Sequence, residues 1–251
     1  MNQKITRIRD YQKKARERDK DSVFVMEGIR SCREVNPERT VMTVVSESFA
    51  LKEEVPENSI IIKDADFLKI SDTKTPQGIL KVVKRTDCSE DEIIGEENGL
   101  ILLLENLQDP GNLGTILRTA EACGVSGIIM NDTTVDVYNP KVVRSSMGSI
   151  LRVRFSVTKD LKKTVEKIRN LGGCVYAAHL KDSESYTKRD YTGKTAFLIG
   201  NEGNGLTDEI TEAADACIHI PMQGKVESLN AAIAATVLIF EAARQREKGG
   251  N

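Results

Sequence analysis

Residues 99–124 read GLILLLENLQDPGNLGTILRTAEACG, and the remainder of the chain has to be built around this stretch. Residues 101–104 form a short, unbroken apolar run, which is typical of a strand buried on both faces of a parallel sheet. The DPGN sequence at 109–112 has strong turn chemistry, and residues 113–123 continue with helical periodicity. We therefore predict a strand, a tight turn and a helix.

Polar side chains crowd the junction between this strand and this helix, namely Glu105, Asn106, Asp109, Asn112 and Arg118. The start of a helix presents free backbone N–H groups beyond the carboxyl end of the strand, which favours anionic ligands. Arg118 lies about one helical turn inside the junction and can reach back to its mouth. An ordinary turn with a solvated arginine also fits, so the function of this junction depends on the remaining sequence.

Composition and charge exclude several classes of protein. With 251 residues, 39% of them hydrophobic, the chain can build one large or two ordinary domains, and its net charge of -2 neither requires nor excludes a nucleic-acid partner. Five cysteines without a CxxC pair argue against a disulfide framework or a zinc site, and we expect no metal. The longest apolar run, 231–240, is too short to span a bilayer, so we predict a cytoplasmic protein.

The first twenty residues carry eight Lys or Arg and three acidic residues. Ile5, Ile8 and Tyr11 can anchor one face of a helix, so this is a basic amphipathic helix. Two interpretations stay open, a solvated surface helix and a phosphate-binding surface.

Four short apolar runs follow, at 23–26, 41–45, 59–62 and 79–83, and they predict a small α/β domain over residues 1–85. Residues 86–98 are acidic and lack sustained periodicity, so we predict a linker there.

The second domain, residues 99–251, alternates strand-like runs with helical patterns, which predicts a mostly parallel sheet with helices on both faces. The runs are 101–104, 127–130, 152–157, 174–178, 196–199 and 216–220. A helix at 161–171 has one apolar stripe. A last helix at 228–246, capped by Ser228, is apolar around most of its circumference, so either a partner subunit or its own domain covers it.

Two further junctions resemble the first in chemistry. Residues 197–206 (FLIGNEGNGL) are a strand followed by a glycine-rich turn, and residues 218–230 (IHIPMQGKVESLN) are a strand, a loop and a helix start. Neither matches the dinucleotide-binding GxGxxG spacing or a P-loop. Three such junctions at the carboxyl ends of strands predict one site between them.

Taken together, the three stretches resemble the signature motifs of the SpoU, or TrmH-like, family of SPOUT RNA methyltransferases. Residues 106–124 are similar to its motif one, 198–206 to motif two, and 220–244 to motif three. VFVMEG at 23–28 and SDTKTPQGIL at 71–80 resemble the ribosomal-protein-like substrate-binding domain that often precedes the catalytic one.

The resemblance implies an α/β fold, in which a trefoil-knotted SPOUT methyltransferase domain with a parallel sheet follows a small ribosomal-protein-like α/β domain. It implies transfer of methyl from S-adenosyl-L-methionine to a ribose 2′-hydroxyl, with ribosomal RNA favoured over transfer RNA by family analogy. Methylation of transfer RNA, a non-catalytic RNA-binding protein and an enzyme acting on a small phosphorylated metabolite are the alternatives.

The resemblance also implies site residues. The cofactor would be bound by Ala178, His179, Gly200, Asn201, Glu202, Gly203, Ile220, Met222, Ser228 and Leu229. Arg118, Asn112, Glu202, Ser228 and Asn230 would form the catalytic group. Because a guanidinium is a poor proton acceptor, we expect Arg118 to anchor phosphate and stabilise a developing alkoxide rather than to act as a base.

The last helix leads to a prediction about assembly. Its alanines permit close approach of helices, so we predict a two-fold homodimer in which this helix packs near its mate and near the helix at 113–123. Ala235 would lie in that seam, and Arg118 would lie close to the cofactor pocket of the partner.

Overall fold

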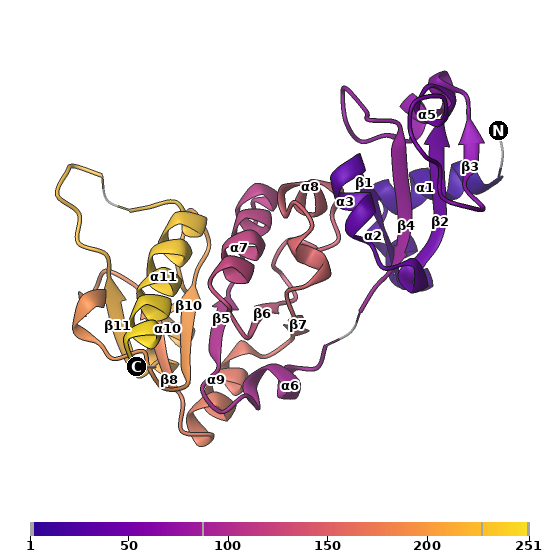
Figure 1. Ribbon diagram of the computed structural model, residues 1–251. Helices are drawn as coiled ribbons and strands as arrows, with labels where there is room; N and C mark the ends of the chain where they lie inside the picture. Colours follow the sequence, from indigo (N-terminus) through magenta and orange to yellow (C-terminus); the bar gives the residue numbers. More distant parts are fainter. Residues whose placement is uncertain (1–2, 87, 227, 250–251) are drawn as a thin grey trace. The chain divides into compact units, whose positions relative to one another are not determined.

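A computed structural model describes residues 3–86, 88–226 and 228–249 of the chain (Figure 1). The chain forms two compact units. The first comprises Met1–Thr86 with Asp136–Leu151, and the second comprises Asp87–Val135 with Arg152–Asn251.

The first unit contains a four-stranded sheet of order β1-β4-β2-β3, in which β4 is antiparallel to β1 and β2 while β3 is parallel to β2. The four predicted apolar runs are its strands: β1 (Val23–Glu27), β2 (Thr40–Ser46), β3 (Ile60–Ile62) and β4 (Ile79–Lys84). The helices of the unit are α1 (Gln3–Lys13), α2 (Ala15–Asp21), α3 (Ile29–Glu34), α4 (Glu47–Ala50), α5 (Asp64–Ile70) and α8 (Pro140–Ser145), with 3-10 turns at Pro37–Arg39 and Ser149–Leu151.

The amino-terminal basic segment forms two helices, because Lys14 is extended and separates α1 from α2. Ile5, Ile8 and Tyr11 are buried in the core of the unit, as expected for its apolar face. Several of its cations are held in ion pairs: Arg7 with Glu17 and Asp21, Lys14 with Asp10, and Arg18 with Asp136. Among the described residues no ion pair is formed by Arg9, Lys13, Arg16 or Lys20.

The second unit contains a seven-stranded sheet of order β7-β6-β5-β10-β8-β11-β9, and all its strand pairs are parallel. The strands are β5 (Leu100–Leu104), β6 (Gly127–Asn131), β7 (Phe155–Thr158), β8 (Cys174–Ala178), β9 (Glu184–Ser185), β10 (Thr195–Ile199) and β11 (Ala216–His219). Six of them are the predicted runs, whereas the two-residue β9 is too short to give a pattern. The trefoil knot that the resemblance implies stays a prediction.

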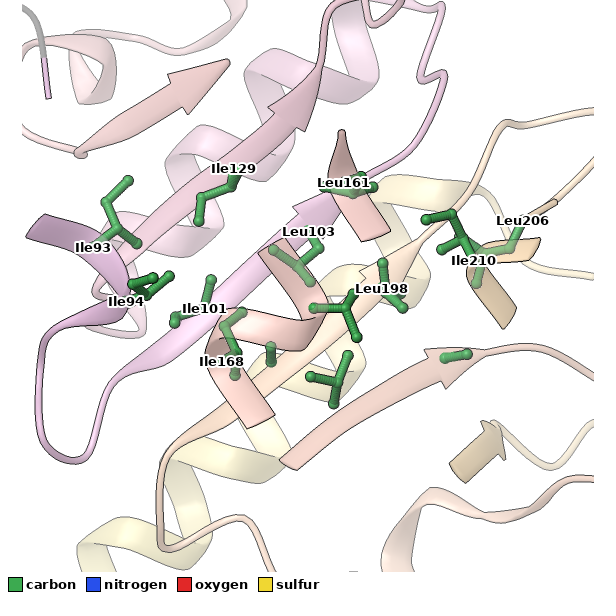
Figure 2. Packing of buried hydrophobic residues seen from close by; sticks show 14 residues of the cluster. Ile93, Ile94, Ile101, Leu103, Ile129, Leu161, Ile168, Leu198, Leu206 and Ile210 are labelled. Carbon is green, nitrogen blue, oxygen red and sulfur yellow. The ribbon is translucent and has the colours of Figure 1, made fainter. Parts of the chain in front are cut away.

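Helices cover both faces of this sheet, as predicted. They are α6 (Glu90–Ile94), α7 (Pro110–Ala122), α9 (Leu161–Asn170), α10 (Asp208–Ala213) and α11 (Ala231–Gly249), with a 3-10 turn at Tyr186–Lys188. Figure 2 shows Ile101, Leu103 and Leu198 of the sheet packed with Ile94 of α6 and Ile168 of α9, while α11 lies behind the sheet. On that second face α11 contacts α7, β5 and β10. In the described part of the chain, no helix is both long and apolar enough to cross a membrane.

Residues 86–98 differ from the predicted linker. They contain α6, whose start carries a capping box formed by Ser89 and Glu92, and Ile93 and Ile94 are buried in the core of the second unit. A five-residue helix with two apolar side chains is too short to show periodicity, which is why the sequence did not reveal it. Position 87 lies outside the described residues.

The last helix is covered mainly by its own unit. Ala235, which we expected in a seam between subunits, is 1% exposed in the single chain. Two large apolar side chains of α11 are exposed to solvent in the single chain, Ile233 at 52% and Phe240 at 51%. The exposed apolar stripe of α11 therefore lies on another side of the helix than Ala235.

Residues 136–151 lie within the predicted catalytic domain by sequence but group with the first unit. Ion-pair and ring contacts join these residues to the amino-terminal part of the first unit. The side chain of Arg18, 4% exposed, pairs with Asp136. The ring of Tyr138 lies 5.0 Å from that of Phe24, and the guanidinium of Arg85 lies 4.2 Å from the Tyr138 ring centroid. The segment thus supplies a polar and an aromatic contact that the amino-terminal sequence alone lacks.

We expect Asp136→Asn to reduce the free energy of unfolding by roughly 2–3 kcal/mol, because it leaves the buried Arg18 guanidinium without its carboxylate. The amide keeps the acceptor that Tyr138 N uses, so the charge is the main change. Urea unfolding measures the effect. Glu53→Gln removes the exposed Arg33–Glu53 pair of the same unit and should lower the free energy of unfolding by less than about 1 kcal/mol. If both variants lose the same free energy of unfolding, the Arg18–Asp136 pair does not have the stabilising role that we assign to it.

Candidate functional site

A cavity of about 320 Å³ lies where β8, β10 and β11 end. The carboxyl ends of parallel strands meet at one edge of the sheet, and ligands of α/β proteins bind there. All ten residues that we expected to bind a cofactor line this cavity: Ala178, His179, Gly200, Asn201, Glu202, Gly203, Ile220, Met222, Ser228 and Leu229. The structure therefore brings motifs two and three to one place.

Nine further residues line the cavity and were missed: Leu180, Ile199, Asn204, Gly205, Ile218, His219, Ala231, Ala234 and Leu238. The spacing of Ala231, Ala234 and Leu238 puts them on one side of a helix, which was a signal for a shared face. The sequence did not show which side of α11 faces the strand ends, so this signal could not be used.

The motif-two turn, residues 200–205, is closed by backbone hydrogen bonds between its two ends. Its first residue must be glycine, because a Cβ on Gly200 would lie 2.2 Å from the carbonyl carbon of Gly205. Asn201 and Gly205 exchange two backbone hydrogen bonds of 3.0 Å, and Asn201 Oδ1 accepts from Gly203 N at 2.8 Å and from Asn204 N at 3.1 Å. The turn thus has a fixed shape that holds Glu202 at its tip.

The Glu202 carboxylate sits at the start of α7. It accepts hydrogen bonds from Gln108 N at 3.1 Å, Asp109 N at 3.0 Å and Asn112 Nδ2 at 2.9 Å. Asp109 caps the helix by accepting from Asn112 N at 2.9 Å. The helix start that we expected to attract an anionic ligand is therefore occupied by the protein's own carboxylates.

These bonds determine the protonation of Glu202. Burial raises the pKa of its carboxyl, but the hydrogen bonds from Asn112 and from backbone amides outweigh burial and hold the pKa below the usual glutamate value. Glu202 is consequently ionised at neutral pH, and its hydrogen bonds anchor the motif-two turn to the start of α7.

A hydrogen-bonded chain joins the three motifs. Asn112 Oδ1 accepts from Asn230 Nδ2 at 2.9 Å, while Asn112 itself donates to Glu202. Asn230 Oδ1 accepts from Ala232 N at 3.0 Å and from Ile233 N at 3.3 Å, so Asn230 caps α11. The predicted cap, Ser228, was wrong, because α11 begins at Ala231 and a cap must reach the second or third amide of the helix.

The other two predicted catalytic residues are placed differently. Ser228 is exposed and lines the cavity. Arg118 is exposed on α7, does not line the cavity, and forms no hydrogen bond or ion pair within the described part of the chain. Its guanidinium is therefore available to a ligand. As for metals, the described residues contain no cluster of three or more His, Cys, Asp or Glu side chains.

The chain matches two family models. Residues 99–240 match the SpoU rRNA Methylase family, and residues 2–81 match the MRM3-like substrate binding domain. Among relatives, the 23S rRNA (guanosine(2553)-2′-O)-methyltransferase RlmP of Bacillus subtilis is 30% identical over 244 residues, which cover 94% of this chain and 96% of the relative.

Solved structures are similar over nearly the whole chain. The SpoU methyltransferase AviRb from Streptomyces viridochromogenes has a TM-score of 0.86 at 27% identity, with 99% of each chain covered. An AdoMet-bound rRNA methyltransferase from Sinorhizobium meliloti has a TM-score of 0.82 at 30% identity, covering 97% of this chain and 95% of that one.

The anchoring role of Glu202 predicts a pH dependence of stability. A folded-state pKa below the unfolded value, about 4.3 for glutamate, means that the ionised group stabilises the fold above pH 4.3 and that this contribution is lost as the pH falls through the folded-state pKa. The stability difference between wild type and Glu202→Gln should therefore be constant near neutral pH and shrink in acid.

Urea unfolding between about pH 7 and pH 3 measures this difference. Glu212→Gln is the matched control, because Glu212 is exposed in the same unit and forms no hydrogen bond or ion pair among the described residues. A Glu202→Gln curve that runs parallel to wild type down to pH 3 would contradict the anchoring role.

Proposed function

Because the chain belongs to the SpoU rRNA methylase family, we propose that it transfers the methyl group of S-adenosylmethionine to a ribose 2′-hydroxyl of ribosomal RNA. One observation carries the proposal: the hydrogen-bonded chain Glu202–Asn112–Asn230 joins all three motifs beside a cavity at the strand ends. The similarity to a 23S rRNA 2′-O-methyltransferase over almost the full length supports both the reaction and the class of RNA.

The cavity suits S-adenosylmethionine. Ile199, Ile218 and Leu238 give it apolar walls for an adenine ring, and the turn of residues 200–205 offers backbone N–H and C=O groups for polar contacts. Cofactor sites commonly combine these two features. When bound, S-adenosylmethionine supplies an activated methyl group on a positively charged sulfur, so the protein has to bring a ribose hydroxyl to it.

Arg118 is our candidate for binding the RNA at the reaction centre. It stays protonated at physiological pH, and its planar donors match the two oxygens of a phosphate. Asn112 and Asn230 fix the start of the helix that carries it. We assign to Arg118 the anchoring of the phosphate and stabilisation of the developing alkoxide, with Ser228 orienting the ribose.

The first unit would bind the rest of the substrate. It matches a substrate-binding family model, and the cations left without ion pairs, Arg9, Lys13, Arg16 and Lys20, can contact phosphates. A ribosomal RNA substrate would be methylated in the cytoplasm.

The test uses radiolabelled S-adenosylmethionine and total RNA from cells that lack the gene. A 2′-O-methyl group blocks alkaline cleavage of the adjacent phosphodiester, so the label should appear in alkali-resistant dinucleotides of large ribosomal RNA. Label in transfer RNA would change the substrate to the alternative class. Absence of both methyl transfer and cofactor binding would overturn the proposal.

Arg118→Ala should lower the methyl-transfer rate about 10²- to 10³-fold, because a donor for the developing charge is lost. Its affinity for S-adenosylmethionine, measured by calorimetry, should stay unchanged because Arg118 does not line the cavity. Arg118→Lys keeps the charge but not the planar fork, so it should recover only part of the rate. Nearly full activity of the lysine variant would show that bidentate anchoring is the wrong account.

We further propose a homodimer built on α11. Ile233 and Phe240, seven residues apart, share one exposed stripe, and burial of such side chains drives subunit association. Arg118 forms no hydrogen bond or ion pair with the described residues, and its helix α7 packs beside α11. Association through this surface would let the arginine of one subunit serve the cavity of the other.

Phe240→Glu should therefore give a folded monomer with little methyl transfer, because the new charge would be buried without a partner. Sedimentation and circular dichroism measure assembly and folding. Leu51→Glu, at an apolar side chain that is 87% exposed in the first unit, should remain dimeric. A wild-type monomer that methylates RNA at full rate would rule out the dimer as a requirement.

A further inference from the structure

Two asparagines outside the catalytic group form a reciprocal pair. Asn106 follows β5 with a positive φ of 56°, a conformation that asparagine tolerates better than most residues. Its backbone N–H donates to Asn131 Oδ1 at 2.9 Å, and Asn131 Nδ2 donates to Asn106 Oδ1 at 2.8 Å. Thr133 Oγ1 also donates to Asn106 Oδ1. The end of β6 thus holds the residue that follows β5 in its unusual conformation.

The Asn106 carbonyl then connects to the cavity. It accepts from Asn201 Nδ2 at 2.8 Å and from Gln108 Nε2 at 3.1 Å. Asn201 is the residue whose Oδ1 shapes the motif-two turn through Gly203 N and Asn204 N. The Asn106 carbonyl therefore binds both the residue that shapes the motif-two turn and the side chain of Gln108, whose backbone N–H donates to Glu202.

We infer that Asn106 and Asn131 are a positioning pair, which sets the motif-two turn and thereby the Glu202 carboxylate and the wall of the cavity. Asn131 lies at the end of β6, outside the three motifs, and touches neither the cavity nor the catalytic group. The consequence for methyl transfer rests on the proposed function, whereas the effect on the turn does not.

The pair is asymmetric, and this makes it testable. In Asn131→Asp, the oxygen that replaces Nδ2 would face Asn106 Oδ1, so one donated bond becomes a repulsion while the acceptor of Asn106 N is retained. In Asn106→Asp, every hydrogen bond of the Asn106 side chain persists, because its Oδ1 acts only as an acceptor. The same chemical change should therefore disturb the turn from position 131 and not from position 106.

Hydrogen exchange followed by mass spectrometry on the full-length protein gives a readout without ligand. We expect Asn131→Asp to lower the protection of residues 200–206 about tenfold, the scale of one lost hydrogen bond. Asn106→Asp should preserve that protection. Thr134→Val is the matched control, because Thr134 Oγ1 donates to the same Asn131 Oδ1 at 2.8 Å without touching Asn106.

Calorimetry with S-adenosylmethionine adds the functional arm. If the pair positions the cavity wall, Asn131→Asp should bind the cofactor about tenfold more weakly, whereas the Thr134→Val control should bind it with unchanged affinity. Faster exchange confined to residues near 131 would overturn the inference, whether or not the cofactor binds. A loosened turn in a protein whose wild type binds no S-adenosylmethionine would instead overturn the proposed function and leave the positioning pair standing.

Discussion

The site depends on one charge placed at one helix end. At the start of α7, the Glu202 carboxylate accepts hydrogen bonds from two backbone N–H groups and from the Asn112 side chain. Unpaired N–H groups and the helix dipole favour a negative charge at this position. A carboxylate held in this way fixes the distance between two segments that lie some ninety residues apart in the chain. Glu202 also lines the cavity, so this contact holds one of the cavity's lining residues in place.

In this arrangement the helix start holds a side chain of the protein, and it is not the place where the ligand binds. In many α/β proteins the helix start binds the phosphate of the ligand directly. Here the helix start binds Glu202, and the cavity is lined by the motif-two turn, the strand ends and α11. In the proposed function the anionic substrate is instead contacted by exposed cations such as Arg118, which forms no hydrogen bond or ion pair among the described residues.

Local sequence patterns predicted the helices and strands of this fold better than they predicted the contacts of its site. Apolar runs identified six strands of the large sheet, since burial on both faces leaves a continuous signal. The ten cavity residues came from a family resemblance, because backbone contacts leave no mark in side-chain chemistry. The Asn230 cap, the α6 helix and the position of Ala235 were missed, as each depends on a boundary or a packing direction that periodicity does not specify.

The placement of residues 136–151 has a consequence for biosynthesis. Domains of a growing chain generally fold in order from the amino terminus. The first unit departs from that order, because Arg18 and Phe24 can contact Asp136 and Tyr138 only after residues 87–135 of the second unit have been translated. At roughly 5–20 residues per second the nascent first unit waits several seconds on the ribosome with an incomplete surface. The first unit can therefore be completed only after part of the second unit has been synthesised.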